Sequence, residues 1–456
     1  MMSWFHRKLR DPMVALGAGQ FGLGLMQGLF MFYYVKVYLN VFKISDYWFS
    51  TAQGLFLVWN AINDPLFGYI QDSSSSWLGN RRLVIRYLAP FVAFSFVFMW
   101  IRSPWEQGLH LVLSLFFYDA FFSAIGVAWA AMFAEVEGGM VGRASAMKHS
   151  QVAILLSVSV IPLTDKISGS LEYFSTFQYL SVIVALIGWA CLYYCSTMTT
   201  SLPSFNVSNQ SLLNERSTKE ENLSLKSVNQ VLSRRDFLSI VAVNCIHTAR
   251  SVMHMNFAAI TTELLISQSI LPKGSISLAV FYALCTLAPQ VIIILCERLV
   301  LLRGAHLLMQ DSFILTIVSS ILLYFLSASP FIVMLFMFID SVAVHSSAPL
   351  FNIIISEFIE DDCVRNERKK PLSSLVFGLN ALFTKPAQSI APLLVVSFLN
   401  AYGYEEYKTQ RTSSEELVEA TRSLLFLPPL FLAAVQYLVF KLYSLAERNR
   451  YRALAI

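Results

Sequence analysis

The amino-acid sequence predicts an all-α membrane protein with twelve transmembrane helices, and three observations carry this prediction. The chain of 456 residues is 56% hydrophobic and only 14% charged, whereas soluble domains contain about 25% charged residues. The apolar residues are grouped in segments long enough to cross a bilayer, which takes roughly 20 residues. The basic residues are concentrated in alternate connections between these segments. This composition excludes a large soluble enzyme and a disordered chain.

Apolar segments follow one another along the whole chain, and each ends at charged residues or at Gly, Pro or Ser. We expect an integral multi-pass membrane protein, with the plasma membrane favoured over an organelle membrane. The approximate ranges of the twelve segments are 12–38, 47–70, 83–102, 107–133, 146–164, 174–196, 237–264, 276–299, 306–327, 330–357, 372–400 and 422–445.

The distribution of Lys and Arg predicts the orientation in the membrane. If the N-terminus is cytoplasmic, most of the 33 Lys and Arg residues fall in cytoplasmic loops and tails, with clusters at 7–10, 81–86, 365–370 and 441–452. Cytoplasmic loops of membrane proteins carry such an excess of basic residues. We therefore expect both termini on the cytoplasmic side and an even number of crossings.

The longest polar stretch divides the apolar segments into six and six. It covers residues 197–236 and is rich in Ser, Asn, Glu and Lys, which predicts a flexible cytoplasmic linker. The expected organisation is therefore an N-terminal six-helix bundle over 1–196, the linker, and a C-terminal six-helix bundle over 237–456. Two such bundles rocking about a site near the bilayer midplane are one plan of secondary transporters.

Several other classes of protein are excluded by what the sequence lacks. The net charge of +4 is too small to indicate nucleic-acid binding, and the six cysteines are scattered and show no metal-ligand spacing. The sequence contains no HExxH, GxSxG or P-loop motif, so we expect no enzymatic activity. We expect no cofactor and no bound metal, and a monomer whose partners are the lipid bilayer and a small-molecule substrate.

Polar residues inside the apolar segments are the candidate functional residues, because burying a charge in lipid costs roughly 2.5–3.5 kcal/mol or more. The segment 47–70 carries Asn60, Asn63 and Asp64 on one helical face, followed by Pro65, which leaves a backbone carbonyl without its helical partner. This stripe can bind a cation or a proton. The alternative is a polar patch that locks this helix to its neighbours.

Two later segments carry similar stripes. In 237–264, two imidazoles and a guanidinium share one face and can bind an anionic or polyhydroxyl substrate or relay protons. In 372–400, Lys385 is too deep to reach water easily and needs a counter-charge, for which Asp64 is the best candidate. A static bridge between the bundles is the alternative. The candidate substrate-binding residues are Gln20, Gln27, Trp129, His149, His247, Arg250, His254, His345, Asn380 and Gln388. Asp119 and Asp340 are cavity-lining candidates, although an amide or acid bonded to a neighbouring helix is equally compatible with the sequence.

Specific phrases of the sequence resemble a known family. The run FLVWNAINDPLFGYIQD, with the following Arg81 and Arg82, resembles the second-helix signature of the major facilitator superfamily, in particular the glycoside–pentoside–hexuronide:cation symporter branch typified by the melibiose carrier. Glu135 with Arg143, the acidic and basic run over 357–370, and Lys385 resemble other parts of that branch. The phrases FFYDAFF and FGLNALFTKPAQSIAPLL look closer still to the transmembrane protein 180 family.

The resemblance implies roles for individual residues. Asn63 and Asp64 match cation-site positions, and Lys385 matches a lysine near that site. Gln20, Trp129 and His149 fall at or near sugar-site positions. Gly68, Asp72, Arg81 and Arg82 match a cytoplasmic gate motif, in which a carboxylate caps a neighbouring helix while the inward side is closed.

The chain also departs from this pattern. Sodium-coupled members carry an acid where this chain has Asn60, and the acid position on the fourth helix is Ile125, with Asp119 nearly two turns away. Proton coupling through Asp64, or no coupling at all, is therefore favoured over coupling to sodium. The insert Ser73–Ser76 lengthens the gate motif.

The expected function is secondary active transport of a small polar solute, sugar-like or an organic anion, by alternating access with a proton coupled through Asp64. The alternative is a transporter-shaped receptor or scaffold that moves no solute. That alternative predicts that the polar stripes pair with one another and leave no central cavity.

Overall fold

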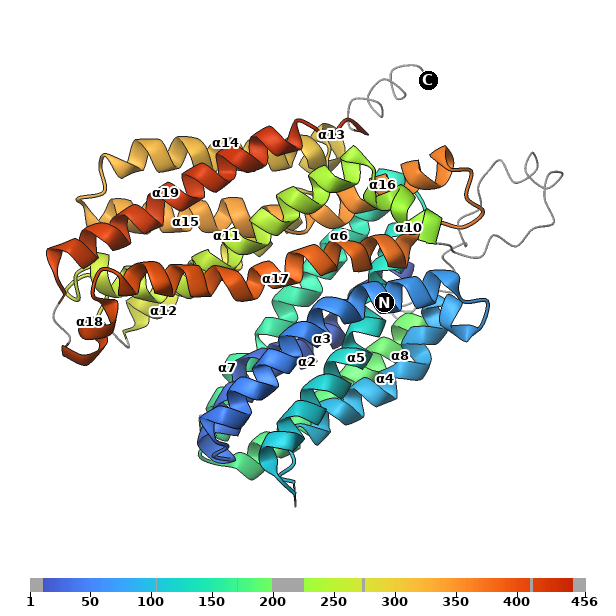
Figure 1. Cartoon of the computed structure of the whole chain (residues 1–456), viewed down its shortest axis with the longest axis horizontal. Helices are drawn as coiled ribbons and strands as arrows, with labels where there is room; N and C mark the ends of the chain where they lie inside the picture. The colour runs from blue at the N-terminus through green and yellow to red at the C-terminus, as the bar shows by residue number, and fades with distance from the viewer. Residues whose placement is uncertain are drawn as a thin grey trace, which may run out of the picture. The chain divides into compact units, whose positions relative to one another are not determined.

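The computed structural model describes residues 11–103, 105–169, 171–198, 225–272, 275–410 and 413–445, and every regular element within them is helical (Figure 1). Contacts divide the chain into two compact units. Unit 1 comprises Met1–Val231 and Ile355–Leu382, and unit 2 comprises Leu232–Ile354 and Phe383–Ile456. Residues 199–224 of the expected linker lie outside the described residues, and the part after them forms α10 (Leu225–Leu232).

The long helices of unit 1 come almost entirely from the N-terminal half of the chain. They are α2 (Pro12–Lys36), α3 (Asp46–Ser73), α4 (Arg81–Phe98), α5 (Gln107–Ala134), α6 (Gly139–Val158), α7 (Val160–Ser168) and α8 (Phe174–Met198). Helix α2 packs against α6 and α8, while α5 packs against α3 and α4, and α4 also packs against α8. The result is a bundle in which α2 is largely covered.

Unit 2 is built mainly from α11 (Arg235–Leu265), α12 (Ile276–Leu295), α13 (Glu297–Arg303), α14 (Ala305–Tyr324), α15 (Pro330–Ser347), α18 (Tyr404–Gln410) and α19 (Glu415–Phe440). Helix α15 packs against α11, α12 and α14, and α19 packs against α11 and α14. The core includes Phe336 and Phe426, whose rings stack with centroids 4.2 Å apart. Aromatic stacking of this kind adds to the burial of apolar surface.

Two helices contribute to both units. Helix α16 (Leu350–Arg365) and helix α17 (Ser373–Asn400) each cross a unit boundary, so that residues 355–382 belong to unit 1. The first part of α17 therefore brings its polar residues to unit 1, and the remainder brings Lys385 and Gln388 to unit 2.

Local sequence signals explain where several helices begin. Asp11 precedes Pro12, and its carboxylate accepts a hydrogen bond of 2.9 Å from the backbone N–H of Met13. Ser45, Ser275 and Ser414 cap α3, α12 and α19 in the same way. Ser and Asp are favoured at this position because their side chains satisfy N–H groups that the first helical turn leaves unpaired.

Each of the twelve predicted apolar segments overlaps described helices, and 146–164, 276–299 and 330–357 each extend over two consecutive helices. Within the described residues, nine helical stretches are long and apolar enough to cross a membrane. Helices α3, α4 and α11 do not reach the same apolar content. Helices α3 and α11 carry the polar stripes, and α4 has three arginines among its first six residues. A helix that lines a polar cavity or an ion-paired interface needs fewer apolar residues than one surrounded by lipid.

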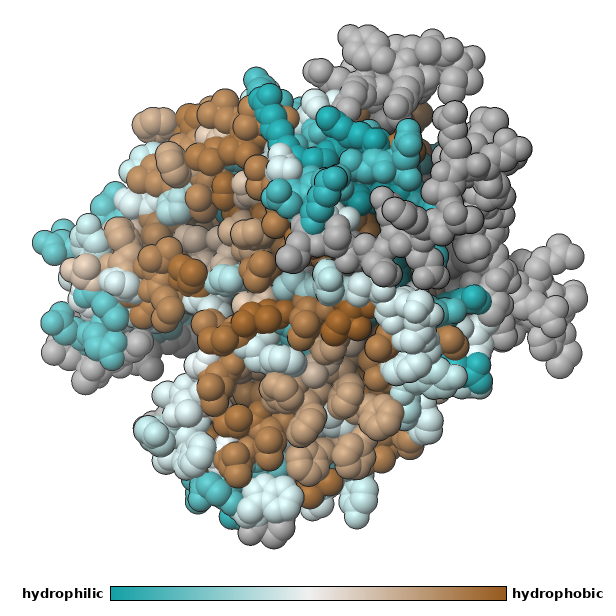
Figure 2. Space-filling view, turned by 45° about the vertical axis from the view of Figure 1, so that its right-hand side comes forward, coloured by the Kyte–Doolittle hydropathy of each residue, from teal (hydrophilic) through white to brown (hydrophobic). Residues whose placement is uncertain are grey.

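The surface is unusually apolar. Large side chains such as Phe94, Ile276, Leu302 and Phe325 are at least 70% exposed, and Figure 2 shows apolar residues over much of the visible face of the molecule. Water-soluble proteins rarely expose apolar patches of this extent. This surface is suited to contact with lipid.

Candidate functional site

The polar stripe of α3 contains two of the buried polar residues of unit 1. Asn63 is completely buried and Asp64 is 8% exposed. The side-chain amide of Asn63 donates a hydrogen bond to the carboxylate of Asp119, which comes from α5 and is also 8% exposed. The structure therefore places a second acid beside the predicted cation site. Asn60, one turn earlier on α3, is half-buried.

The sequence comparison does not place Asp119 at the cation site, because Asp119 lies nearly two turns from Ile125, the position that carries the acid in sodium-coupled members of the family. That argument assumed the family's register between the two helices, whereas the structure pairs Asp119 directly with Asn63. The available sequence signal was weak: Asp119 and Ser123 are one turn apart on one helical face.

Helix α17 approaches α3 very closely beside Asp64. A Cβ atom added to Gly378 would lie 2.5 Å from the backbone carbonyl oxygen of Asp64 and 2.8 Å from the Cα of Pro65. A Cβ on Gly68 would likewise collide with the carbonyl of Ser374. Small residues allow this close approach of two helix backbones within a membrane protein.

The predicted gate motif forms a connected ion-pair cluster. The carboxylate of Asp72, 1% exposed, lies 2.5 Å from the Arg81 guanidinium, which also lies 3.5 Å from Glu135. The other oxygen of Asp72 accepts a hydrogen bond of 2.7 Å from the backbone N–H of Leu375, in the first turn of α17. A carboxylate at a helix N-terminus is favoured by the helix dipole. Arg82 takes part in the capping of α4, where its backbone N–H donates to Asn80.

A second ion pair joins α6 to α16 within unit 1. The Arg143 guanidinium, 4% exposed, lies 2.9 Å from the Glu360 carboxylate and also donates to the carbonyl of Ala134. Both Arg143 and the acidic run around Glu360 belong to the segments that carry the family resemblance.

The sugar-site candidates of unit 1 take part in contacts between helices. The indole N–H of Trp129 donates a hydrogen bond of 2.9 Å to the carbonyl of Leu16, and Gln27 accepts one of 3.2 Å from the Tyr118 hydroxyl. A ring nitrogen of His149 lies 2.8 Å from the carbonyl of Ser145 in its own helix. Gln20 is half-buried on α2. Their substrate-binding role stays a prediction.

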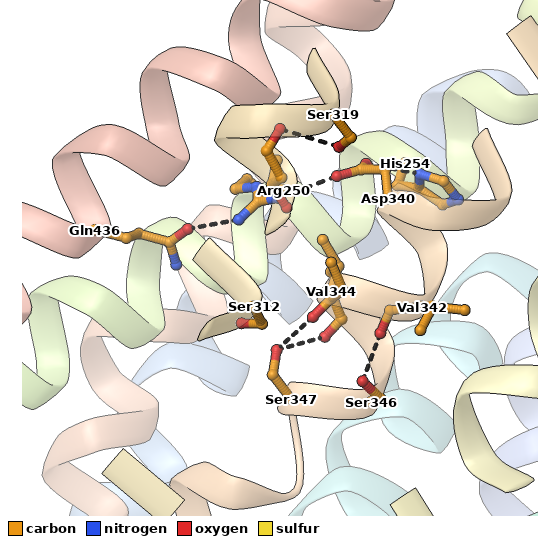
Figure 3. A network of polar contacts seen from close by, with 12 residues as sticks. Arg250, His254, Ser312, Ser319, Asp340, Val342, Val344, Ser346, Ser347 and Gln436 are labelled. Atoms are coloured by element: carbon orange, nitrogen blue, oxygen red, sulfur yellow. Dashed lines mark hydrogen bonds and ion pairs between the residues drawn. The ribbon is translucent and has the colours of Figure 1, made fainter. Parts of the chain in front are cut away.

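The polar stripe of α11 forms a buried network in unit 2 (Figure 3). The Arg250 guanidinium donates to Gln436 of α19 at 2.8 Å, to Thr316 of α14 at 2.9 Å and to Asp340 of α15 at 3.0 Å. The second oxygen of Asp340 lies 3.1 Å from the Nδ1 of His254. In Figure 3, Gln436 and Asp340 approach Arg250 from opposite sides. Asp340 thus joins the two predicted residues Arg250 and His254.

The other two histidines lie near this network. The Nδ1 of His345 lies 3.3 Å from the Ser251 hydroxyl, and its ring centroid is 5.5 Å from that of His254. His247 is 3% exposed and packs edge-on against Phe351. Neither ring nitrogen of His247 has a hydrogen-bond partner in the part of the chain that the structure describes.

A cavity of about 30 Å³ adjoins the network inside unit 2. This is room for about two water molecules. Arg250, His254 and Asp340 form its polar wall, and the remaining lining is mainly apolar. Its other lining residues are Met253, Phe257, Ala258, Thr261, Met337, Val395, Leu424, Leu425, Pro428, Pro429 and Leu432.

The candidates of α17 are divided between the units. Asn380 is 8% exposed and belongs to unit 1, whereas Lys385 and Gln388 belong to unit 2, where Lys385 is half-buried and Gln388 is exposed. The pairing of Lys385 with Asp64 stays a prediction.

Helices with apolar outer surfaces and buried ion pairs are typical of a polytopic membrane protein. The chain belongs to the MFS/sugar transport protein family, whose family model matches residues 15–447. It is therefore an integral membrane protein with a transport rather than an enzymatic function.

Curated relatives have similar lengths. The chain is 26% identical to Transmembrane protein 180 of Gallus gallus over 444 residues, which cover 90% of this chain and 84% of that protein. It is 25% identical to Transmembrane protein 180 of Mus musculus over 433 residues, covering 86% and 81% of the two chains.

Solved transporters share the fold. A bacterial homologue of the iron transporter ferroportin, in the outward-facing state, aligns with a TM-score of 0.63 at 13% identity, covering 95% of this chain and 99% of that chain. The fucose:proton symporter FucP of E. coli aligns with a TM-score of 0.61 at 13% identity, covering 93% and 98%. The human organic anion transporter MFSD10 aligns with a TM-score of 0.58 at 13% identity, covering 95% and 98%.

Proposed function

We propose that this protein is a secondary active transporter that moves a small polar solute by alternating access, coupled to a proton through Asp64. The observation that carries the proposal is the polar group of Asn63, Asp64 and Asp119, which lies almost completely buried between apolar helices. A carboxylate kept at such a place is costly and is typical of ion and proton pathways.

Asp119 is a second acid in the proposed proton-coupling group, beside Asp64. Asp64 and Asp119 are both buried acids of unit 1, and one proton added to either reduces the negative charge that the apolar surroundings must accommodate. The carboxylate of Asp119 accepts the hydrogen bond from the Asn63 amide. Asp64 is then the acid that takes and releases the coupled proton, and Asp119 is the acid that positions Asn63 beside it.

The proposed topology has twelve crossings and cytoplasmic termini. The positions of Lys and Arg support it, as does the overlap of each predicted apolar segment with helices. It predicts that the sequons beginning at Asn206, Asn209 and Asn222 remain unglycosylated, because the loop that contains them stays on the cytoplasmic side. A shift in mobility after endoglycosidase treatment of the wild-type protein, lost when these three residues are replaced by Gln, would contradict this orientation.

Transport is tested with purified full-length protein in proteoliposomes that contain a pH-sensitive dye. L-Fucose, melibiose, glucuronate and propionate are added in turn, and the internal pH and counterflow of labelled solute are measured at two pH values. We expect one solute to enter with protons, and Asp64→Asn to abolish accumulation while the protein stays folded. Asp311→Asn, which removes an exposed acid of α14, is the matched control and should transport normally. Equal accumulation by Asp64→Asn would remove Asp64 from the mechanism.

A receptor or scaffold that transports no solute is the second candidate. It is favoured by the internal pairing of the Arg250 network, in which Gln436, Thr316 and Asp340 all accept from the terminal nitrogens of the guanidinium. This candidate predicts neither counterflow nor proton movement with any solute of the panel. The cavity beside the network supports the transporter instead.

A further inference from the structure

We propose that the surface of unit 1 where α4 begins binds an anionic phospholipid, with the lipid phosphate held by Arg82 and Arg86. The acyl chains of this lipid lie against the exposed apolar surface of α4 and α8 that continues from the two arginines. The inference goes beyond the proposed function, because it holds whether or not the protein moves a solute.

Two arginines share one face of α4 close to its start. Arg82 and Arg86 are four positions apart, which places them one turn apart on the helix, and Arg86 is exposed while Arg82 is half-buried. Arg81 beside them pairs with Asp72 and Glu135, whereas Arg82 and Arg86 form no ion pair within the described part of the chain. Like charges at this spacing repel each other. An anion between the two guanidinium groups therefore stabilises both.

Exposed aromatic side chains with polar groups surround the two arginines. Trp77, in the short helix η2 (Trp77–Gly79), packs edge to face against Tyr87 of α4, with ring centroids 5.4 Å apart. Tyr193 of α8 lies beside Arg86, with its ring centroid 5.3 Å from the guanidinium carbon. All three aromatic side chains are more than 40% exposed. Trp and Tyr are enriched at the level of the lipid headgroups, so these residues mark the depth at which phosphates lie.

An apolar surface continues from this aromatic group along two helices that pack against each other, α4 and α8. On α4, Phe91 and Phe94 are exposed, and on α8 Leu186 and Trp189 are exposed on the same face as Tyr193. A free phosphate ion would use the positive charges but leave this apolar surface uncovered. A phospholipid matches both parts, because its phosphate pairs with guanidinium groups and its chains cover apolar side chains.

The place of the arginines along α4 favours a lipid with net negative charge. Arg86 lies just inside the predicted apolar segment 83–102, and its long side chain can extend along the helix to keep the guanidinium at the headgroup level. The proposed topology, on which this point alone depends, puts the start of α4 on the cytoplasmic side. Anionic lipids give the cytoplasmic leaflet a negative surface potential that attracts basic residues near the membrane.

The experiment measures lipid binding to the purified full-length protein by native mass spectrometry from a mild detergent. Dioleoylphosphatidylserine and dioleoylphosphatidylcholine, which have the same acyl chains, are added in equal amounts, and the ratio of the two single-lipid complexes is recorded. We expect the wild-type protein to prefer phosphatidylserine by about tenfold or more, because each arginine near the membrane surface adds a several-fold attraction for an anionic lipid. Dioleoylphosphatidylglycerol should show the same preference, since the site recognises the charge and not the serine.

Arg82→Gln/Arg86→Gln is the decisive variant, and it should bind the two lipids about equally. Arg82→Lys/Arg86→Lys keeps both positive charges and should retain most of the preference. The matched control is Lys43→Gln/Arg102→Gln, which removes two exposed positive charges from the loops before α3 and after α4, at the opposite end of α4. Its net charge equals that of the first variant, and it should keep the wild-type preference.

Three results would overturn the inference. The first is a wild-type protein that shows no preference for the anionic lipids. The second is an equal loss of preference in Arg82→Gln/Arg86→Gln and in the control, because the net charge of the protein would then explain the binding. The third is a complete loss in Arg82→Lys/Arg86→Lys, because a site that recognises charge tolerates this replacement. None of these results bears on transport, which the proteoliposome assay tests separately.

Discussion

The Asp72 carboxylate of α3 accepts a hydrogen bond of 2.7 Å from the backbone N–H of Leu375, at the start of α17. Its other oxygen lies 2.5 Å from Arg81. The buried Asp72 thus caps α17 and also pairs with Arg81, the first residue of α4. Gly68, one turn before Asp72, permits this contact because any side chain at that position would collide with the backbone carbonyl of Ser374. The first turn of α17 depends on the short motif that joins α3 to α4.

We predict that Asp72→Ala exposes the first turn of α17 to solvent exchange. Without the carboxylate, the N–H of Leu375 loses its acceptor, and the unpaired N–H groups of the first turn fray more readily. Hydrogen–deuterium exchange should become at least about tenfold faster in peptides covering 373–379, as expected for the loss of about 1.4 kcal/mol of local stability. Glu137→Ala, which removes an exposed acid after α5, is the control. Unchanged exchange in Asp72→Ala would show that α17 does not need this cap.

The contact between Gly378 and the backbone of Asp64 predicts that one added methyl group, in Gly378→Ala, lowers the stability of the protein. Gly378→Ala places a Cβ 2.5 Å from a carbonyl oxygen that cannot move without shifting α3. Such overpacking costs typically 1–3 kcal/mol, so we expect a lower unfolding temperature and reduced yield of folded protein.

Gly54→Ala is the control for that substitution. Gly54 lies in the same helix as Asp64, and an added Cβ there meets no atom within 4 Å. Alanine is favoured over glycine in a helix interior by up to about 1 kcal/mol, so this variant should be neutral or slightly stabilised. If both variants unfold at the same temperature, the close packing of α17 on α3 is wrong.

The Asn63–Asp119 pair predicts different results for two replacements of one residue. Asp119→Asn keeps an oxygen that can accept from the Asn63 amide, and it should unfold close to the wild-type temperature. Asp119→Leu removes the acceptor of this hydrogen bond from the buried Asn63 amide, and the loss of such a bond costs about 1–3 kcal/mol. Thermal unfolding in detergent measures the difference. Equal destabilisation by both variants would show that the carboxylate charge, rather than the hydrogen bond, stabilises the pair.

The sequence allowed much of the fold to be predicted because the signals of membrane helices are local. Long apolar runs indicate helices wherever they occur, and each of the twelve predicted segments overlaps described helices. The Asp72–Arg81 pair was also predictable, because only nine positions separate its two residues and the motif is specific.

The partners of the buried polar residues were harder to predict, since they depend on how helices are rotated and shifted against one another. Arg250 and Asp340 are 90 positions apart, and Asn63 and Asp119 are 56 apart. The stripe of α11 identified Arg250 and His254, but nothing in the spacing of α15 singled out Asp340 as their acid. The assignment of residues 355–382 to unit 1 likewise depends on long-range packing that hydropathy does not encode.

The Arg250–Asp340 pair predicts a large cost when one partner is removed and a smaller cost when both are. Arg250→Met leaves a buried carboxylate without its main partner, and breaking a buried pair in this way costs about 3–5 kcal/mol. The double variant Arg250→Met/Asp340→Leu removes both charges and should recover part of that loss, since well-packed apolar residues often replace a buried pair at little cost. The control is Arg303→Ala, which breaks the Arg303–Asp311 ion pair. Both side chains of that pair are more than 40% exposed, so its loss should cost less than about 1 kcal/mol. Thermal unfolding measures the stability of all three variants. If Arg250→Met is as mild as Arg303→Ala, Arg250 is not the residue that compensates Asp340, and another cation must share the cavity with it.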